Sequence, residues 1–319
     1  STTPVANRFA IQIPTVPYFH CMQYLLFLSV SFFWGINFWL MKNAIVVFSP
    51  VGVAAIRVLS GAVFLAIVVA FRERKWPFKR SDIPCLALII AVGYTWPFII
   101  QPYLIHFCGS GVIGLMPSLV PLITILLSIP LLNIRPSTRE FTGVLIGLGF
   151  IGLLFIDGMH REIDTAHLFL AATVPLSYAI SNTMVKRVYT KVSPVMLTFI
   201  CLLTTSVLLM PYALLEASPS TMTINDPTAV TIAWVSVISL GVFGTGIALL
   251  CFTIMIQRRG PLFAGMVTYV IPVIALIAGG IDGEYISPLQ IIALVGILLM
   301  VAIVQWPASI RKTAATGPG

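Results

Sequence analysis

Charged residues are scarce in this chain. Lysine, arginine, aspartate and glutamate make up 9% of its 319 residues, whereas a soluble globular domain carries about 25%. Hydrophobic residues make up 59%, and the mean hydropathy is +1.04. This composition excludes a soluble domain and predicts an all-α integral membrane protein that crosses the lipid bilayer several times.

Residues that could perform chemistry inside a membrane are few and scattered. The four histidines, at positions 20, 106, 160 and 167, lie outside the predicted spans or at their ends, and no acidic residue lies in the middle of a span. The five cysteines form no CxxC pair; they are Cys21, Cys85, Cys108, Cys201 and Cys251. We therefore predict no catalytic residue, no metal site and no cofactor, and we expect the protein not to be an enzyme.

The lack of a mid-span carboxylate also bears on which solute the protein could carry. A proton-coupled multidrug antiporter would be expected to exchange cations at an intramembrane carboxylate. The lack of such a carboxylate in this sequence favours a neutral, zwitterionic or anionic solute over a hydrophobic cation.

Apolar stretches of about 20 residues, each long enough to cross roughly 30 Å of hydrocarbon, recur along the chain. The ten predicted spans are 22–42, 50–72, 83–105, 110–132, 139–156, 167–187, 194–215, 229–252, 261–281 and 287–306.

Lysine and arginine orient these spans. With the loop after the first span taken as external, 15 of the 18 cations lie on the opposite side, Lys42 and Arg161 lie outside, and Arg57 lies within a span. By the positive-inside rule, both termini are then cytoplasmic, in a multi-pass protein of the cell inner membrane. The net charge of +8 thus reflects topology, and we expect no nucleic acid as a partner. The sequence leaves the oligomeric state open, and a monomer is compatible with it.

The two halves of the chain resemble each other. A shift of 151 residues pairs Gly109 with Gly260, Gly114 with Gly265 and Pro121 with Pro272, and a shift of 144 pairs Trp34 with Tyr178, Lys42 with Lys186 and Ser49-Pro50 with Ser193-Pro194. Each copy holds five spans, an odd number, so the second copy must be inverted in the membrane. The predicted organisation is a cytoplasmic tail at 1–21, a first five-helix repeat at 22–156, an external linker at 157–166, a second repeat at 167–306 and a cytoplasmic tail at 307–319.

Several motifs are similar to those of a known family. These are the Trp34-Gly35 pair in FWGIN, Arg57 early in the second span, the glycine-to-proline run of span 110–132, and RRGPLFAGMVTYVIPVIALIAGGIDGE at 258–284. They resemble the drug/metabolite transporter superfamily, EamA type. The resemblance implies ten transmembrane helices as two inverted five-helix repeats, and secondary transport that commonly exports amino acids or related metabolites. One departure is that span 110–132 ends in Leu132-Asn133, where the family usually has the Gly-Glu that Gly283-Glu284 keeps.

Polar and aromatic residues at mid-depth are candidates to line a central substrate cavity. They are Trp34, Asn37, Arg57, Tyr94, Phe98, Gln101, Ser118, Tyr178, Asn182, Thr268 and Tyr269. Plain packing is the competing interpretation for Trp34, and a bond to a neighbouring helix is the one for Gln101. Arg57 could clamp two helices together, or could contact a substrate carboxylate or a gate.

These observations predict a carrier of small amphipathic metabolites, amino acids first, that exports them by alternating access. The small-molecule substrate and the lipid bilayer are its expected partners. The alternatives are a small multidrug-type efflux carrier and an intramembrane enzyme.

Overall fold

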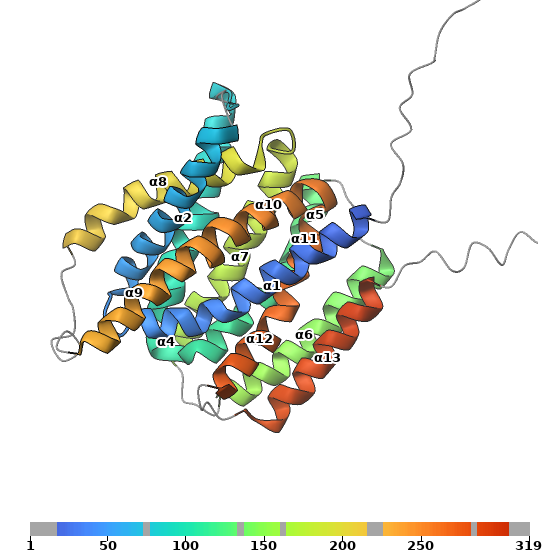
Figure 1. The fold of residues 1–319 in the computed structure, drawn as a ribbon. Coiled ribbons are helices and arrows are strands. Elements are labelled where there is room, and N and C mark those ends of the chain that lie inside the picture. The colour runs from blue at the N-terminus through green and yellow to red at the C-terminus, as the bar shows by residue number, and fades with distance from the viewer. Residues whose placement is uncertain are drawn as a thin grey trace, which may run out of the picture.

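The computed structural model describes residues 18–72, 77–132, 137–159, 164–215, 226–281 and 286–305. Every regular element in these ranges is a helix, as the composition predicts (Figure 1). The longer helices are α1 (Tyr18–Ala44), α2 (Pro50–Arg72), α4 (Trp96–Leu115), α5 (Val120–Leu132), α6 (Thr138–Met159), α7 (Thr165–Val188), α8 (Pro194–Leu215), α9 (Pro227–Gly241), α10 (Ala248–Arg259), α12 (Val267–Ile281) and α13 (Pro288–Gln305). Shorter segments join some of them, namely η1 (Arg80–Asp82), α3 (Ile83–Ile89), η2 (Ile90–Thr95), η3 (Met116–Leu119), η4 (Val242–Ile247) and α11 (Pro261–Gly265).

Seven helical segments in the described ranges are long and apolar enough to cross a membrane. They are Met22–Ala44, Pro50–Phe71, Arg80–Cys108, Thr165–Val188, Pro194–Leu215, Pro227–Arg259 and Pro261–Ala278. Two shorter apolar segments, Met116–Leu132 and Phe141–Phe150, accompany them. The protein is therefore a membrane protein with several spans. Residues 1–17 of the predicted N-terminal tail, residue 306 of the predicted second repeat and the whole predicted C-terminal tail at 307–319 lie outside the described residues. So do residues 160–163 of the predicted linker, Asn133 and Gly283-Glu284.

Predicted and observed helix ends agree best where the sequence marks them. The predicted spans 50–72 and 194–215 coincide with α2 and α8, which both begin with a proline, a residue whose fixed φ suits the first turn of a helix. The predicted end of a span at residue 105 differs from the structure, because α4 continues to Leu115. Residues 107–115 contain neither proline nor a charged side chain, so nothing in them forces the helix to end.

The helices pack around α1 and α2. Helix α1 packs against α9, α10 and α12, while α2 packs along α8. At one edge of the bundle, α6 and α13 lie side by side (Figure 1). Helix α1 buries Val30 and Met41 but exposes Leu28 and Phe32 on its other side. A helix that is apolar on both faces suits a position between protein and lipid.

Two of the spanning segments contain one turn of π-helix, at η2 and at η4. Each turn holds a glycine, Gly93 in η2 and Gly244 in η4, and the two glycines are 151 residues apart. A methyl group at Gly93 would overlap the side chain of Ser181, and one at Gly244 would overlap that of Asn37. The glycines thus let a polar side chain of a neighbouring helix approach the backbone of the π turn. Single π turns of this kind are frequent at functional sites.

A second set of glycines brings α2 close to η4. A Cβ added to Gly61 would lie 2.9 Å from the carbonyl oxygen of Gly241 and 3.2 Å from the amide nitrogen of Gly246. Both neighbours are backbone atoms, so they cannot move aside as a flexible side chain could. Close contact between backbones through small residues is a common way for helices to pack in membranes.

We predict that Gly61→Ala destabilises the protein by about 1–3 kcal/mol, because the methyl group must push the backbone of η4 away. Gly149→Ala is the matched control, since a Cβ at Gly149 has no neighbour within 4 Å in the part of the chain that the structure describes. The control should leave stability unchanged or raise it slightly, because alanine favours helix more than glycine does. Thermal unfolding of both variants in detergent measures the difference, and an equal apparent Tm for the two would contradict the close contact.

Candidate functional site

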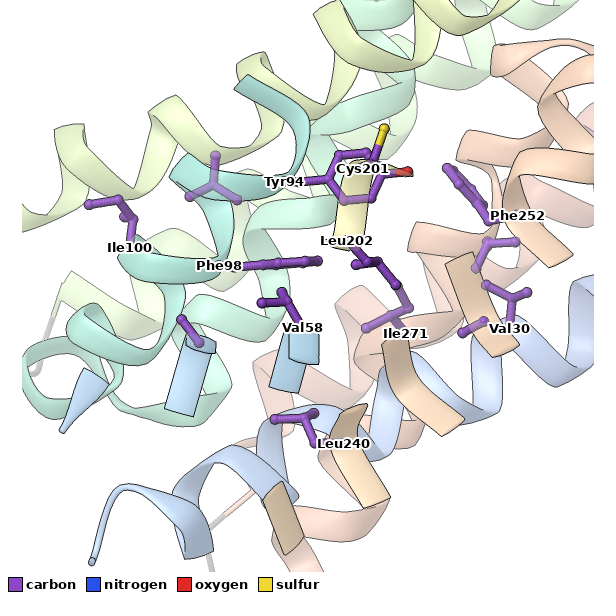
Figure 2. Close-up of a cluster of buried hydrophobic side chains, with 14 of the residues drawn as sticks. Val30, Val58, Tyr94, Phe98, Ile100, Cys201, Leu202, Leu240, Phe252 and Ile271 are labelled. Atoms are coloured by element: carbon purple, nitrogen blue, oxygen red, sulfur yellow. The ribbon is translucent and has the colours of Figure 1, made fainter. Parts of the chain in front are cut away.

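A cavity lies at the centre of the bundle, between α1, α2, the η2–α4 segment, α5, α7, α10 and α12. Its volume is about 60 Å³, counting only positions that the centre of a water molecule can occupy. Tyr94 and Phe98 project into this region from one side, and Phe252 and Ile271 approach it from the other (Figure 2). The cavity is large enough for a few water molecules, and no aspartate or glutamate lines it within the described residues.

Nine of the eleven residues predicted to face a central cavity line this one. They are Trp34, Asn37, Arg57, Tyr94, Phe98, Gln101, Tyr178, Asn182 and Thr268. They come from both halves of the sequence, and the fold brings them together although up to 234 positions separate them in the chain (Trp34 to Thr268). Their role in binding a substrate stays a prediction.

The other two candidates, Ser118 and Tyr269, do not line the cavity. Ser118 is buried in η3 and donates a hydrogen bond to the carbonyl oxygen of Thr268 over 3.1 Å. Tyr269 follows Thr268 on α12, and its ring lies next to Gly147 of α6, where an added Cβ would be 3.5 Å from it. Successive residues of a helix point about 100° apart, and on α12 it is Thr268 that faces the cavity while Tyr269 turns towards α6.

Arg57 on α2 is the one charged residue among the described residues that line the cavity, and it is 4% exposed. Its Nε donates to Oγ1 of Thr245 over 2.7 Å, and that hydroxyl donates to the carbonyl oxygen of Leu240 over 2.9 Å. The guanidinium carbon lies 4.4 Å from the centre of the Phe98 ring. Arg57 therefore connects α2 to η4 and to α4, as the clamp interpretation predicts.

The same guanidinium has an N–H donor group without a hydrogen-bond partner among the described residues. Its Nη1 is buried and has no hydrogen-bond partner in the described part of the chain. A buried polar group is expected to have a partner, and this one lies in a residue that lines the cavity. The position that the 144-residue shift pairs with Arg57 is Cys201, which is fully buried beside Tyr94 (Figure 2). Among the described residues that line the cavity, the first half of the chain thus provides the cation and the second half provides none.

On α1, Trp34 and Asn37 share one acceptor on η4. The Trp34 Nε1 donates to the carbonyl oxygen of Gly244 over 3.0 Å, and the Asn37 Nδ2 donates to it over 3.4 Å. The Trp34 ring also packs against Phe252, with 4.7 Å between ring centres. The remaining oxygen of Asn37, Oδ1, is buried without a partner among the described residues.

The opposite wall is built by α4 and α7. The hydroxyl of Tyr178 donates to Oε1 of Gln101 over 3.4 Å, a long hydrogen bond that connects the two helices across the cavity. Tyr94 and Phe98 meet edge to face, with 6.0 Å between ring centres. This wall therefore combines aromatic surface with two polar groups, the Gln101 amide and the Tyr178 hydroxyl, which are joined by one long hydrogen bond.

Several residues that line the cavity were not predicted from the sequence, including Gly93, Phe252 and Thr253. Gly93 could have been found, because it pairs with Gly244 under the 151-residue shift. Thr253 is a polar residue in an apolar stretch, and it accepts a hydrogen bond from Thr198 over 3.2 Å. Phe252 carries no such signal, since a phenylalanine inside a span usually faces lipid or packs on a neighbour.

A polar network lies next to the cavity at one end. Lys186 on α7 donates to the carbonyl oxygen of Gln257 on α10 over 2.8 Å. The Gln257 Nε2 in turn donates to the carbonyl oxygens of Tyr189 and Val192, over 2.8 and 3.0 Å. The Tyr189 side chain is fully buried, and its hydroxyl donates to the carbonyl oxygen of Asp82. These bonds connect the ends of α7 and α10 to η1, and Lys186 and Gln257 directly follow Val185 and Ile256 of the cavity lining.

A bundle of apolar helices around a small cavity, with mostly apolar walls and a few polar groups, fits a polytopic membrane transporter. The model of the EamA-like transporter family matches residues 22–156 and 165–306. This chain therefore belongs to the EamA-like transporter family.

Individual relatives agree with this assignment. An uncharacterized transporter of Archaeoglobus fulgidus is 25% identical over 78% of this chain and 86% of its own. The uncharacterized inner membrane transporter YedA of Escherichia coli K12 is 24% identical over 85% of this chain and 86% of its own. A protein of known crystal structure superposes on this chain with a TM-score of 0.66 and a sequence identity of 17%. The match covers 89% of this chain and 97% of the other, so the two proteins share the fold.

We predict that Arg57→Lys destabilises the protein by about 1.5–3 kcal/mol, because a lysine cannot reproduce the hydrogen bond of the guanidinium Nε to Thr245. The control is Arg259→Lys, since Arg259 also lies over a phenylalanine ring, that of Phe263 at 4.9 Å, but is exposed. Thermal unfolding and gel filtration in detergent compare the two. Equal stability of both variants would show that Arg57 does not clamp α2 to η4.

Proposed function

We propose that this protein is a secondary transporter that exports small amphipathic metabolites, amino acids first, by alternating access to the central cavity. The observation that carries the proposal is the lining of that cavity. Aromatic and aliphatic side chains provide surface for an apolar group, while buried amides and hydroxyls can replace water around a polar one.

The proposed transporter has ten transmembrane helices in two inverted repeats. Three observations support this. Ten segments result when α13 is added to the seven long segments and the two shorter apolar ones. The family model matches the chain in two segments, and the π turns η2 and η4 hold glycines that are 151 residues apart. The contacts at these turns are also related, because Asn37 of α1 approaches Gly244 while Ser181 of α7, 144 residues later, approaches Gly93.

The size of the cavity fits a carrier whose walls move. About 60 Å³ holds a few water molecules, so a solute as large as an aromatic amino acid requires the walls to separate. The polar network of Lys186, Gln257 and Tyr189 lies at the predicted cytoplasmic end and is a candidate for the gate that opens there.

The aromatic content of the walls favours solutes with a ring or an aliphatic tail. The resemblance noted from the sequence extends to the aromatic amino acid exporter YddG, which is the structural type that we propose for this chain. Trp34, Tyr94, Phe98, Tyr178 and Phe252 would provide the contact surface.

The proposed inversion can be tested with two positions that the 144-residue shift pairs. We predict that Val46→Cys and Thr190→Cys, each in a background without the five native cysteines, react with a membrane-impermeant maleimide from opposite sides. Val46→Cys should label in intact cells, and Thr190→Cys only after permeabilisation, because both residues are exposed in loops. Labelling of both from the same side would rule out the inversion.

Transport itself can be measured as efflux of labelled amino acids from proteoliposomes. We expect Gln101→Ala and Trp34→Phe to lower the initial efflux rate roughly three- to tenfold, since each loses a hydrogen bond at the cavity. Trp96→Phe is the control: its Nε1 also bonds a neighbour, Thr173 at 2.9 Å, but Trp96 does not line the cavity.

The outcomes separate the parts of the proposal. Should no amino acid leave faster than from protein-free vesicles, the substrate class is wrong. Transport at the wild-type rate in both cavity variants would instead place the binding site elsewhere.

A further inference from the structure

We propose that the predicted cytoplasmic end of the protein carries a surface that binds the phosphate head groups of anionic lipids. This basic surface consists of four exposed cations from two distant segments of the chain, namely Lys79, Arg80, Arg187 and Lys191. The inference goes beyond the proposed function, because it concerns the membrane around the protein and not the solute in the cavity.

The fold brings the two segments of the basic surface together. The hydroxyl of Tyr189 donates to the carbonyl oxygen of Asp82, 107 residues earlier in the chain. The Tyr189 ring also packs against that of Phe78, with 6.0 Å between ring centres. Helix α3, which begins directly after η1, packs against α7. One pair of cations, at η1, and the other, at the end of α7 and in the turn after it, therefore lie at the same end of two adjacent helices.

Both pairs of cations lie where an apolar span ends. Among the segments that are long and apolar enough to cross a membrane, one begins at Arg80 and another ends at Val188. Exposed apolar side chains accompany the cations, Ile83 and Leu88 on α3 and Val188 on α7. Cations at the end of a span reach the level of the lipid head groups, while apolar side chains beside them contact the acyl chains. A lipid uses both kinds of contact, whereas a soluble anion would use only the first.

The charges of the basic surface are largely uncompensated within the described residues. Asp82 is the acid in the two segments, so four cations and one carboxylate leave a net charge of +3. Its two oxygens already accept hydrogen bonds, from the backbone nitrogen of Lys79 over 3.2 Å and from the hydroxyl of Ser81 over 3.1 Å. None of the four cations forms an ion pair with a described residue. Uncompensated cations at this level attract lipid phosphates, and arginine can bind a phosphate with two parallel hydrogen bonds.

Other cations at the same end of the protein are placed differently. Arg259 at the end of α10 lies over the ring of Phe263, with 4.9 Å from its guanidinium carbon to the ring centre. Gln257, two residues earlier, bonds instead to Tyr189 beside the basic surface. Two positions along a helix correspond to a rotation of about 200°, so Arg259 lies on the side of α10 that points away from the basic surface. Arg258 and Arg259 therefore offer a control of equal charge.

The test measures how lipids stabilise the purified protein in an uncharged detergent. Dioctanoyl phosphatidylglycerol is the anionic probe and dioctanoyl phosphatidylcholine is the zwitterionic one. Apparent affinities come from the rise of Tm with lipid concentration. We expect phosphatidylglycerol to bind at least tenfold more tightly, and the difference to shrink at high salt, because salt screens exposed charges. Equal affinities of the two lipids would overturn the proposal.

Two double variants that lose the same charge test whether the binding is local. Arg80→Gln/Arg187→Gln removes one cation from each segment and should weaken the binding of phosphatidylglycerol at least tenfold. Arg258→Gln/Arg259→Gln removes two cations at the end of α10 and should weaken it less than threefold. Equal weakening in the two variants would mean that the overall positive charge attracts the lipid, and would overturn the basic surface.

A second pair of substitutions covers the case in which Arg80→Gln/Arg187→Gln does not fold. Lys79→Gln/Lys191→Gln changes two other exposed side chains of the basic surface and should also weaken the binding of phosphatidylglycerol at least tenfold. Glycerol 3-phosphate distinguishes a lipid site from a site for free phosphate. We expect it to leave Tm unchanged at concentrations at which phosphatidylglycerol saturates, and a shift as large as that of the lipid would overturn the proposal. These measurements do not involve efflux, so a failure here leaves the proposed function untouched.

Discussion

The centre of this protein depends on how α1 and α2 pack against one π turn, η4. In a membrane, a backbone carbonyl that is not used inside its own helix must find another donor. At η4, the carbonyl oxygen of Gly244 accepts hydrogen bonds from the side chains of Trp34 and Asn37. The hydroxyl of Thr245 accepts one from the Nε of Arg57. Gly61 allows α2 to approach closely enough for the bond of Arg57 to form. The arrangement of the cavity follows from this contact, because it fixes three of the lining side chains.

Much of the fold could be predicted, because hydrocarbon imposes helices of a certain length. The composition alone indicated an all-helical membrane protein, and prolines at residues 50 and 194 marked two helix starts correctly. The π turns could not be predicted. A shift from the α to the π pattern depends on which side chains of other helices bond the carbonyls, and that is decided by packing. The end of α4 was placed too early, at residue 105, whereas the next proline of the sequence is Pro117, two residues beyond the observed end at Leu115.

The candidate cavity was predicted better than its details. Polar residues inside spans are costly in lipid, so the sequence signals those that must face the protein interior. Nine of the eleven candidates line the cavity on this basis. The presence of a polar residue in a span does not tell how the helix is rotated about its axis. For that reason both Thr268 and Tyr269 were predicted to face the cavity, although only Thr268 of the two lines it. Tyr269 turns towards Gly147 of α6 instead.

In the described cavity lining, the charge comes from the first half of the chain, and position 201 of the second half holds a cysteine where the first half has Arg57. In a carrier with the proposed inverted halves, the states open to either side would be similar in shape and yet differ in electrical energy. A unit charge that crosses one quarter of a 100 mV membrane potential changes in energy by about 0.6 kcal/mol. A shift of Arg57 by such a fraction would make the cell's membrane potential favour one of the two states, even in the absence of a coupling ion.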